Sequence, residues 1–128
     1  MKLVTLVLAA LALVPEQETR FVAVDLYADT GGKPLVAWQI ELETDAKIVG
    51  VEGGEKPPYY DPAALQGGRI ILARFTTEPN PPSGRVLVAR VHLQETGKTD
   101  YTARLMAAAS PGGARIEPRI HVVRVGGK

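Results

Sequence analysis

The side chains that most often carry enzyme chemistry are scarce in this chain of 128 residues. The sequence has no cysteine, which excludes disulfides, thiolate metal sites and a cysteine nucleophile. His92 and His121 lie in strand-like runs without the spacing of a metal-binding pair, so we expect solvated histidines. Ser83 and Ser110 lie in Pro/Gly-rich loops outside any Gly-x-Ser-x-Gly context, and we expect them to form loops. We therefore expect no catalytic residue, no metal ligand set and no cofactor.

A further pattern with chemical meaning is the triplet Asp29-Thr30-Gly31, which follows an apolar run. It is similar to the catalytic loop of aspartic proteases, in which two carboxylates share one proton because like charges a few Å apart do not both ionise. A chain of this size would supply one half of such a dyad. The next residues, Gly32-Lys33-Pro34, are typical of a turn. We interpret the triplet as a turn and keep the aspartic-protease-like half-site as the lowest alternative.

The sequence Tyr59-Tyr60-Asp61 follows Pro57-Pro58 and is the one aromatic cluster outside the strand-like runs. Aromatic rings on a proline-fixed loop give contact area at low entropic cost, so they suit stacking on sugar rings or anchoring a protein interface. The other interpretation is that both rings fold back over one end of the core. We take Tyr59, Tyr60 and Asp61 as the candidate binding residues.

Carboxylates are the remaining source of chemistry. Glu41 and Glu43 share one face of a strand-like run, and we expect both to face water rather than to form a glycosidase pair across a cleft. Calcium takes oxygen ligands from loops, but no Asp-x-Asp-x-Asp run is present, so the sequence leaves calcium binding open. The loop aspartates in question are Asp29, Asp45, Asp61 and Asp100.

The length and the charge of the chain limit the number of domains and the kinds of partner. A chain of this length forms one domain and buries about two-thirds of its unfolded surface, which suffices for folding without disulfides. The formal net charge is +1, and the charges are dispersed rather than gathered in a stripe. Because a nucleic-acid partner requires clustered cations to neutralise its phosphates, we expect none.

The first residues have the layout of a secretory signal. Lys2 precedes an uncharged stretch from Leu3 to Val14, and Ala10-Leu11-Ala12 offers small residues for cleavage after Ala12. Twelve residues are too few to cross about 30 Å of hydrocarbon as a helix, so we expect no membrane span. We predict a signal peptide over residues 1–12, extending to about 14, and export to the periplasm, the cell surface or the medium.

The chain beyond residue 20 is dominated by apolar and polar residues in strict alternation, which predicts half-buried β-strands. Residues 20–27 and 35–43 alternate on either side of a turn, and we expect them to form a hairpin with Trp38 in the core. In residues 85–93 the alternation places Leu87, Ala89, Val91 and Leu93 on one side.

Other segments complete the prediction. Residues 48–52, 69–76, 101–109 and 120–125 read as strands, and Pro118 makes the last of these an edge strand or a bulge. Asp61 as N-cap and Pro62 as the first helical residue predict one short helical turn near residues 61–66. The fold class is therefore all-β, an antiparallel β-sandwich or jelly roll of seven to nine strands in one domain over residues 20–125.

This arrangement resembles a cohesin-type domain within the broader superfamily of carbohydrate-binding-module-like β-sandwiches, and more closely small exported single-domain bacterial proteins of planctomycete type. The resemblance covers about residues 20–125 and implies binding through one sheet face, to protein or to polysaccharide. Its contact residues have no identifiable counterparts here. The segments that carry it are residues 24–42, 48–54, 69–75 and 84–93.

The sequence thus predicts an exported, non-catalytic binding or structural module that contacts a partner protein through a sheet face. The alternatives are a carbohydrate-binding module, a surface-assembly subunit that pairs through an edge strand, and the half-site at Asp29. The partner and the oligomeric state are open at this point.

Overall fold

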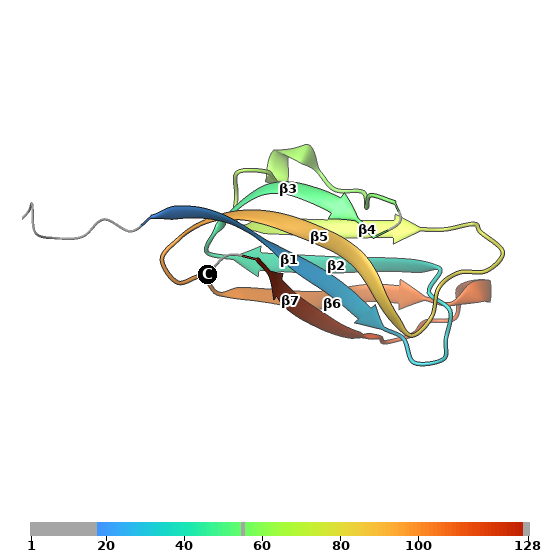
Figure 1. Ribbon diagram of the computed structural model, residues 1–128. Helices are drawn as coiled ribbons and strands as arrows, with labels where there is room; N and C mark the ends of the chain where they lie inside the picture. The colour runs from blue at the N-terminus through green and yellow to red at the C-terminus, as the bar shows by residue number, and fades with distance from the viewer. Residues whose placement is uncertain (1–17, 55, 127–128) are drawn as a thin grey trace, which may run out of the picture.

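The computed structural model describes residues 18–54 and 56–126, and these residues form an all-β structure with two short 3-10 turns (Figure 1). The predicted signal peptide, residues 1–12, lies outside the described residues. The strands are β1 (Thr19–Asp29), β2 (Ala37–Thr44), β3 (Lys47–Gly53), β4 (Arg69–Phe75), β5 (Arg85–Thr96), β6 (Tyr101–Ala109) and β7 (Arg119–Val125), and the turns are η1 (Pro62–Ala64) and η2 (Pro111–Gly113).

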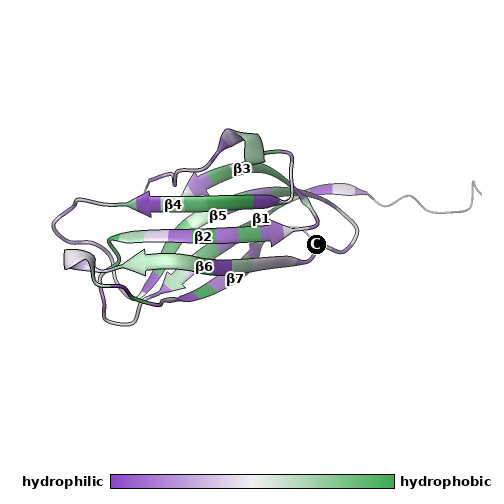
Figure 2. Ribbon diagram, turned by 180° about the vertical axis from the view of Figure 1, so that it is seen from behind, coloured by the Kyte–Doolittle hydropathy of each residue, from purple (hydrophilic) through white to green (hydrophobic). Residues whose placement is uncertain are grey.

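The strands form two antiparallel sheets that pack face to face. The larger sheet has the order β3-β5-β1-β7, and the smaller one has the order β4-β2-β6. Figure 1 looks onto the larger sheet, and Figure 2 looks from behind, onto the smaller one. The predicted class, an antiparallel β-sandwich, is therefore confirmed, with seven strands in the described residues.

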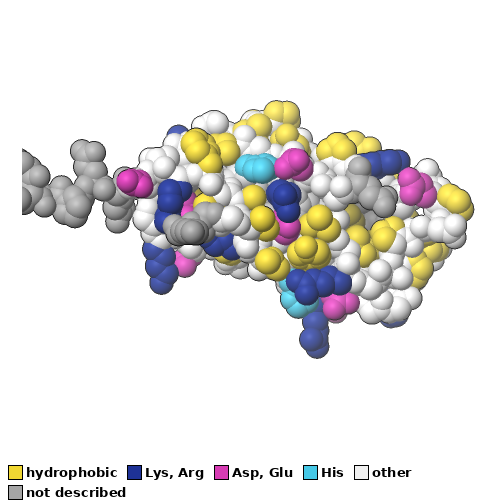
Figure 3. Space-filling view, viewed as in Figure 1, with side chains coloured by type: hydrophobic (Ala, Val, Ile, Leu, Met, Phe, Trp, Pro, Cys, Tyr) yellow, Lys and Arg dark blue, Asp and Glu magenta, His cyan; other side chains and the backbone are white. Residues whose placement is uncertain are grey.

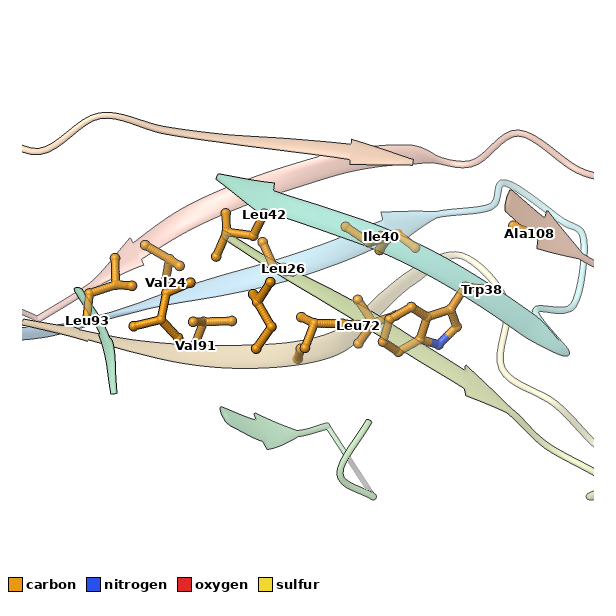
Figure 4. Packing of buried hydrophobic residues seen from close by; sticks show 14 of the residues in the cluster. Val24, Leu26, Trp38, Ile40, Leu42, Leu72, Val91, Leu93 and Ala108 are labelled. Carbon is orange, nitrogen blue, oxygen red and sulfur yellow. The ribbon is translucent and has the colours of Figure 1, made fainter. Parts of the chain in front are cut away.

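The core fills the space between the sheets because alternate residues of each strand face inward. Trp38, Ile40 and Leu42 of β2 lie opposite side chains of β1 and β5 such as Leu26 and Val91 (Figure 4). Trp38 is buried, as predicted. Burial of each large aliphatic side chain contributes about 1.5–3 kcal/mol, so this layer is the main source of stability. Side chains with no exposed surface include Val24, Leu26, Ile40, Leu42, Ile48, Leu72, Val91 and Leu93.

The hairpin predicted for residues 20–27 and 35–43 is wrong. β1 pairs with β5 and β7, whereas β2 pairs with β4 and β6, so the two segments belong to different sheets. The intervening chain crosses between the sheets because its backbone bonds to distant loops instead of closing a turn between neighbouring strands. Thr30 N–H donates to the carbonyl of Gly84 at 2.8 Å, and Leu35 N–H donates to that of Pro82 at 2.7 Å.

Bulges reverse the predicted alternation in two strands. In β5 the register with β1 shifts so that Val88 is an extra residue, and Val88 is buried in place of Leu87. In β6 the register with β2 shifts at Met106, and Ala108 is buried in the core. Because a bulge places two residues opposite one, every side chain beyond it changes face.

The predicted turn chemistry is confirmed at the ends of the strands. The Asp61 carboxylate accepts from Ala63 N–H at 2.9 Å, and Pro62 opens the single turn η1. Gly97 adopts a φ of 75° between β5 and β6, which favours glycine. β7 begins after Pro118 and pairs only with β1, as predicted for an edge strand.

Candidate functional site

The outer face of the smaller sheet carries small, uncharged side chains at one end. Since Trp38 and Ile40 of β2 face the core, Ala37 and Gln39 face outward. Register places Gln39 beside Ala73 of β4 and Ala107 of β6. In Figure 2 the start of β2 and the end of β6 carry green and pale colours in the part of this face away from the C-terminus. The side chains at this end of the face are therefore mostly small and weakly polar.

Tyr59 extends this face at the edge of β4. Its N–H donates to the Ala73 carbonyl at 2.7 Å, and Ala73 N–H donates back to the Tyr59 carbonyl at 3.0 Å. This isolated bridge places the Tyr59 ring against Phe75, with ring centroids 6.1 Å apart and planes inclined by 24°. The exposed fractions of the two residues are 58% and 59%. Two neighbouring aromatic residues therefore stay open to solvent.

We call the surface made by Tyr59, Phe75, Ala73, Gln39 and Ala107 the alanine–aromatic face. Sequence reasoning treated a sheet face and the tyrosine loop as two separate candidate surfaces. The bridge to β4 joins them into one. No signal in the sequence indicates this contact, because it depends on which strand edge the loop meets.

The three predicted binding residues have different positions. Tyr59 is exposed on the alanine–aromatic face, whereas Tyr60 is half-buried and packs against the core. Asp61 is exposed, and its carboxylate caps η1. Of the two interpretations considered for the tyrosine rings, folding back over the core describes Tyr60 and exposure describes Tyr59.

An apolar groove opens between the sheets beside this face. Its volume is about 360 Å³, and Trp38, Val86 and Val88 lie among its apolar walls. Phe75 lines the groove and also belongs to the alanine–aromatic face. Gly54 lies at the groove, where the backbone approaches so closely that a Cβ at this position would lie 2.2 Å from the Leu87 carbonyl oxygen.

Charged side chains border the mouth of the groove. Lys56 and Glu78 form an ion pair of 3.0 Å. The Arg74 guanidinium donates to the Pro57 carbonyl at 2.7 Å and lies 5.9 Å from the centre of the Tyr59 ring. Arg74 therefore connects the groove to the exposed aromatic pair.

The other end of the smaller sheet's outer face is charged, and here the expectation of two solvated glutamates is wrong for Glu41. Glu41 faces outward but is only 5% exposed, because Arg69 and Arg104 cover it. Arg69 Nε donates at 2.6 Å and Arg104 Nη2 at 3.1 Å. Burial raises the pKa of Glu41, but the hydrogen bonds from Arg104 and Arg69 outweigh it, and the pKa is lowered overall. Glu43 is exposed, as expected.

Carboxylates of the larger sheet are also buried and paired, which the sequence did not indicate. Asp25 of β1 lies opposite Arg90 of β5 and accepts two hydrogen bonds from it, at 2.6 and 2.9 Å. Glu95 is buried at the end of β5 and pairs with Arg124 and Arg20. The hydrogen bond from Arg124 lowers the pKa of Glu95 and outweighs the opposing effect of burial.

The remaining candidate residues serve local structure or lie on the surface. Asp29 accepts from Gly31 N–H at 3.1 Å, which is the hydrogen bond of a turn. Asp45 accepts from Asp100 N–H at 2.9 Å. His92 contacts Glu52 at 2.5 Å on the outer face of the larger sheet, where Figure 3 shows histidine, acidic and basic side chains together. Ser83, Ser110 and His121 lie in the loops and the strand predicted for them.

Residues 18–54 and 56–126 contain no group of three or more histidine, aspartate or glutamate side chains placed to hold a metal ion. Within the same residues, no helix combines the length and the apolar character needed to cross a membrane.

Comparison with known proteins identifies one curated relative. The chain is 32% identical over 97 residues to an aspartate–tRNA(Asp/Asn) ligase of Rhizobium rhizogenes, an alignment that covers 72% of this chain. The chain spans only 16% of the length of that ligase. No family model matches the chain, and no solved structure matches it.

Proposed function

We propose that this chain is a non-catalytic binding module that contacts a partner protein through the alanine–aromatic face. The observation that carries the proposal is the exposed pair of Tyr59 and Phe75 beside a sheet surface of small side chains. Tyrosine and phenylalanine lose little side-chain entropy on binding and are enriched in protein interfaces, where a few such residues supply most of the affinity.

The neighbouring groove supports the same surface. Its volume of about 360 Å³ falls within the range of sites that accept one large apolar side chain or a small ligand. Because Phe75 borders both the groove and the face, a partner lying on the face also reaches the groove. The proposed interface thus combines a surface of small and aromatic side chains with one recess for an anchoring side chain.

A carbohydrate ligand is the second candidate. It is favoured by the exposure of the Tyr59 and Phe75 rings, since exposed aromatic rings can stack on sugar rings. It is opposed by the sparse hydrogen-bonding groups among the alanines around the rings. The aspartic-protease-like half-site at Asp29 and the activity of the tRNA ligase have no comparable support in the site geometry.

The module is proposed to act outside the cytoplasm, as a cohesin-like domain would. The support is the uncharged stretch after Lys2, which has signal-peptide character. The test is a fusion of the whole chain to a reporter that is active only after export. Reporter activity that disappears when Leu6 is replaced by Arg supports export, and equal activity of both fusions contradicts it.

The binding surface is tested by capture from an extracellular extract of the native organism. The unaltered chain, Tyr59→Ala/Phe75→Ala and Phe21→Ala are immobilised in equal amounts. Phe21 is the matched control, because it is 71% exposed but lies on β1 of the other sheet. A protein held by the unaltered chain and by Phe21→Ala, but lost with the double variant, supports the proposal. Equal retention by all three contradicts it.

A parallel measurement separates protein from sugar. Cellulose, chitin and xylan are each mixed with the same three proteins, and the unbound fraction is measured. If a polysaccharide removes the unaltered chain and Phe21→Ala from solution but leaves the double variant unbound, the ligand is a polysaccharide rather than a partner protein. If no polysaccharide removes the unaltered chain from solution, the partner protein is favoured.

A further inference from the structure

The four edge strands of the sandwich differ in how their backbones are covered. An edge strand has backbone N–H and C=O groups that can pair with another chain unless loops or side chains block them. On β3, Ile48 N–H donates to the Gly67 carbonyl and the Ile48 carbonyl accepts from Gln66 N–H, at 2.8 and 2.7 Å. The outer edge of β3 is therefore covered near its start, at Ile48, by the chain's own loop.

The two edges of the smaller sheet are also covered in part. Tyr59 bridges to Ala73 on the outer side of β4. The chain after η2 returns along β6, where Arg115 bridges to Ala109 and Ile116 N–H donates to the Ala108 carbonyl at 3.0 Å. β7 differs from the other three: within residues 18–54 and 56–126, its only backbone pairing is the ladder with β1.

Arginine and histidine are the titratable side chains of β7 itself, which carries no carboxylate, while Asp29 of β1 lies opposite Arg119. Arg119 and His121 are exposed on β7, and Arg115 is exposed on the segment before it. Glu117 is the only exposed carboxylate between Arg115 and Gly126. Figure 3 shows basic and histidine side chains, with an acidic one, at the rim where Figure 1 places β7. An approaching acidic segment would be attracted here, and a basic one would be repelled.

The side chains of β7 that point toward the other sheet are Ile120, Val122 and Arg124, and Arg124 is paired with the buried Glu95. Ile120 and Val122 are half-buried and pack against the core, while Val123 faces outward and is 38% exposed. A strand added next to β7 would place alternate side chains beside Ile120 and Val122, and the others beside Arg119 and His121. The edge therefore favours a segment in which apolar and acidic residues alternate.

We propose that β7 accepts an extended acidic segment of a partner protein as a fifth strand of the larger sheet. Addition of a strand supplies affinity through backbone hydrogen bonds, and the cations supply the preference for acidic residues. A second copy of this chain is a poorer occupant. A pairing of two seven-residue strands buries far less than the roughly 1,200–2,000 Å² of a stable interface, and it would bring two cationic edges together.

The probe is an eleven-residue peptide of alternating glutamate and valine with blocked termini, and the protein is the full ¹⁵N-labelled chain. Titration is followed by backbone NMR and repeated with a peptide in which lysine replaces every glutamate. We expect shifts concentrated at the amides of β7 and β1, with the lysine peptide binding at least about tenfold more weakly.

Backbone pairing is tested with two further peptides, N-methylated at alternate positions in opposite phases. The backbone N–H groups of a strand point alternately to its two edges, and only one edge of an added strand faces β7. Methylation of the N–H groups on that edge should abolish binding, and methylation of those on the opposite edge should not. Equal binding of both N-methylated peptides would overturn strand addition.

Charge recognition is tested with Arg119→Glu and the control Lys98→Glu, which makes the same charge change in the exposed loop before β6. Arg119→Glu should weaken binding by about tenfold, and Lys98→Glu should leave it nearly unchanged. No shifts at millimolar peptide, equal loss in the two variants, or shifts confined to the alanine–aromatic face would each overturn the proposal. None of these outcomes contradicts the proposed function, since Tyr59 and Phe75 lie on the side of the smaller sheet.

Discussion

The outer faces of the two sheets differ in how far their aromatic side chains are covered. On the larger sheet, Tyr27 is covered by the Arg85 guanidinium, 4.5 Å from the ring centre, and Asp25 is covered by Arg90. On the smaller sheet, Tyr59 and Phe75 remain exposed. On the larger sheet the outward Tyr27 and Asp25 are covered by arginines and, among the described residues, only the isolated Phe21, at the start of β1, is an exposed aromatic residue, whereas on the smaller sheet two exposed aromatic residues lie side by side. The comparison indicates that substitutions on the first should reduce stability and those on the second should reduce binding.

The largest loss of stability is expected from Glu95→Ala. Glu95 is 2% exposed, and its removal leaves Arg124 and Arg20 without their carboxylate partner. Loss of one partner of a buried ion pair costs about 3 kcal/mol of unfolding free energy. Urea denaturation of both proteins gives the difference. A loss below about 1 kcal/mol would mean that this cluster contributes no more than a surface pair.

Acid should destabilise the chain through the same carboxylates. The folded-state pKa values of Glu95 and Glu41 lie below the ordinary value of 4.5, so their contribution is complete above about pH 4.5 and is lost as the pH falls through the folded values. Thermal unfolding between pH 7 and pH 2 measures this dependence. Glu95→Gln should flatten the curve below pH 4.5, and an unchanged slope would exclude Glu95 as a source of acid lability.

These buried carboxylates mark the limit of sequence reasoning. Alternation is a local property, so the strand segments, the burial of Trp38 and the edge position of β7 followed from the sequence. Glu41 lay on the predicted face, but its cover depends on strand register with β4 and β6, which no single segment encodes. Glu95 was assigned to a turn, yet it continues the inward positions of β5.

At the candidate site, too, local features could be predicted from the sequence and features that depend on the arrangement of strands could not. The proline-fixed tyrosines were recognisable from their types, and Tyr59 proved to be exposed. Phe75 was not recognised as a candidate binding residue, because its position in a strand predicts burial. It is the last residue of β4 and is exposed to solvent. The bulge at Val88 reverses the faces at the start of β5, and a bulge leaves no clear sign in a continuous apolar run.

A smaller effect is expected from Arg85→Ala. The substitution removes the guanidinium from the Tyr27 ring and should cost about 0.5–1 kcal/mol, the usual range for a cation–π contact at an exposed site. Urea denaturation measures the cost. If the unfolding free energy is unchanged, the contact between Arg85 and Tyr27 does not stabilise the fold, and it no longer distinguishes the larger sheet from the smaller one.

The smallest change in stability is expected from Phe75→Ala, within about 0.5 kcal/mol, because the residue is 59% exposed. A loss above about 1.5 kcal/mol would show that Phe75 supports the fold, and the exposed pair would then be structural rather than a binding surface. Unfolding curves for this variant and for the matched control Phe21→Ala decide between these outcomes.

The central claim is that partners contact the alanine–aromatic face. The most direct measurement places a photo-crosslinking benzoylphenylalanine at position 75 in one protein and at position 21 in another, and irradiates each in the native extracellular extract. The account predicts a crosslinked partner from position 75 and none from position 21. Equal crosslinking from both positions, or crosslinking from position 21 alone, would contradict it.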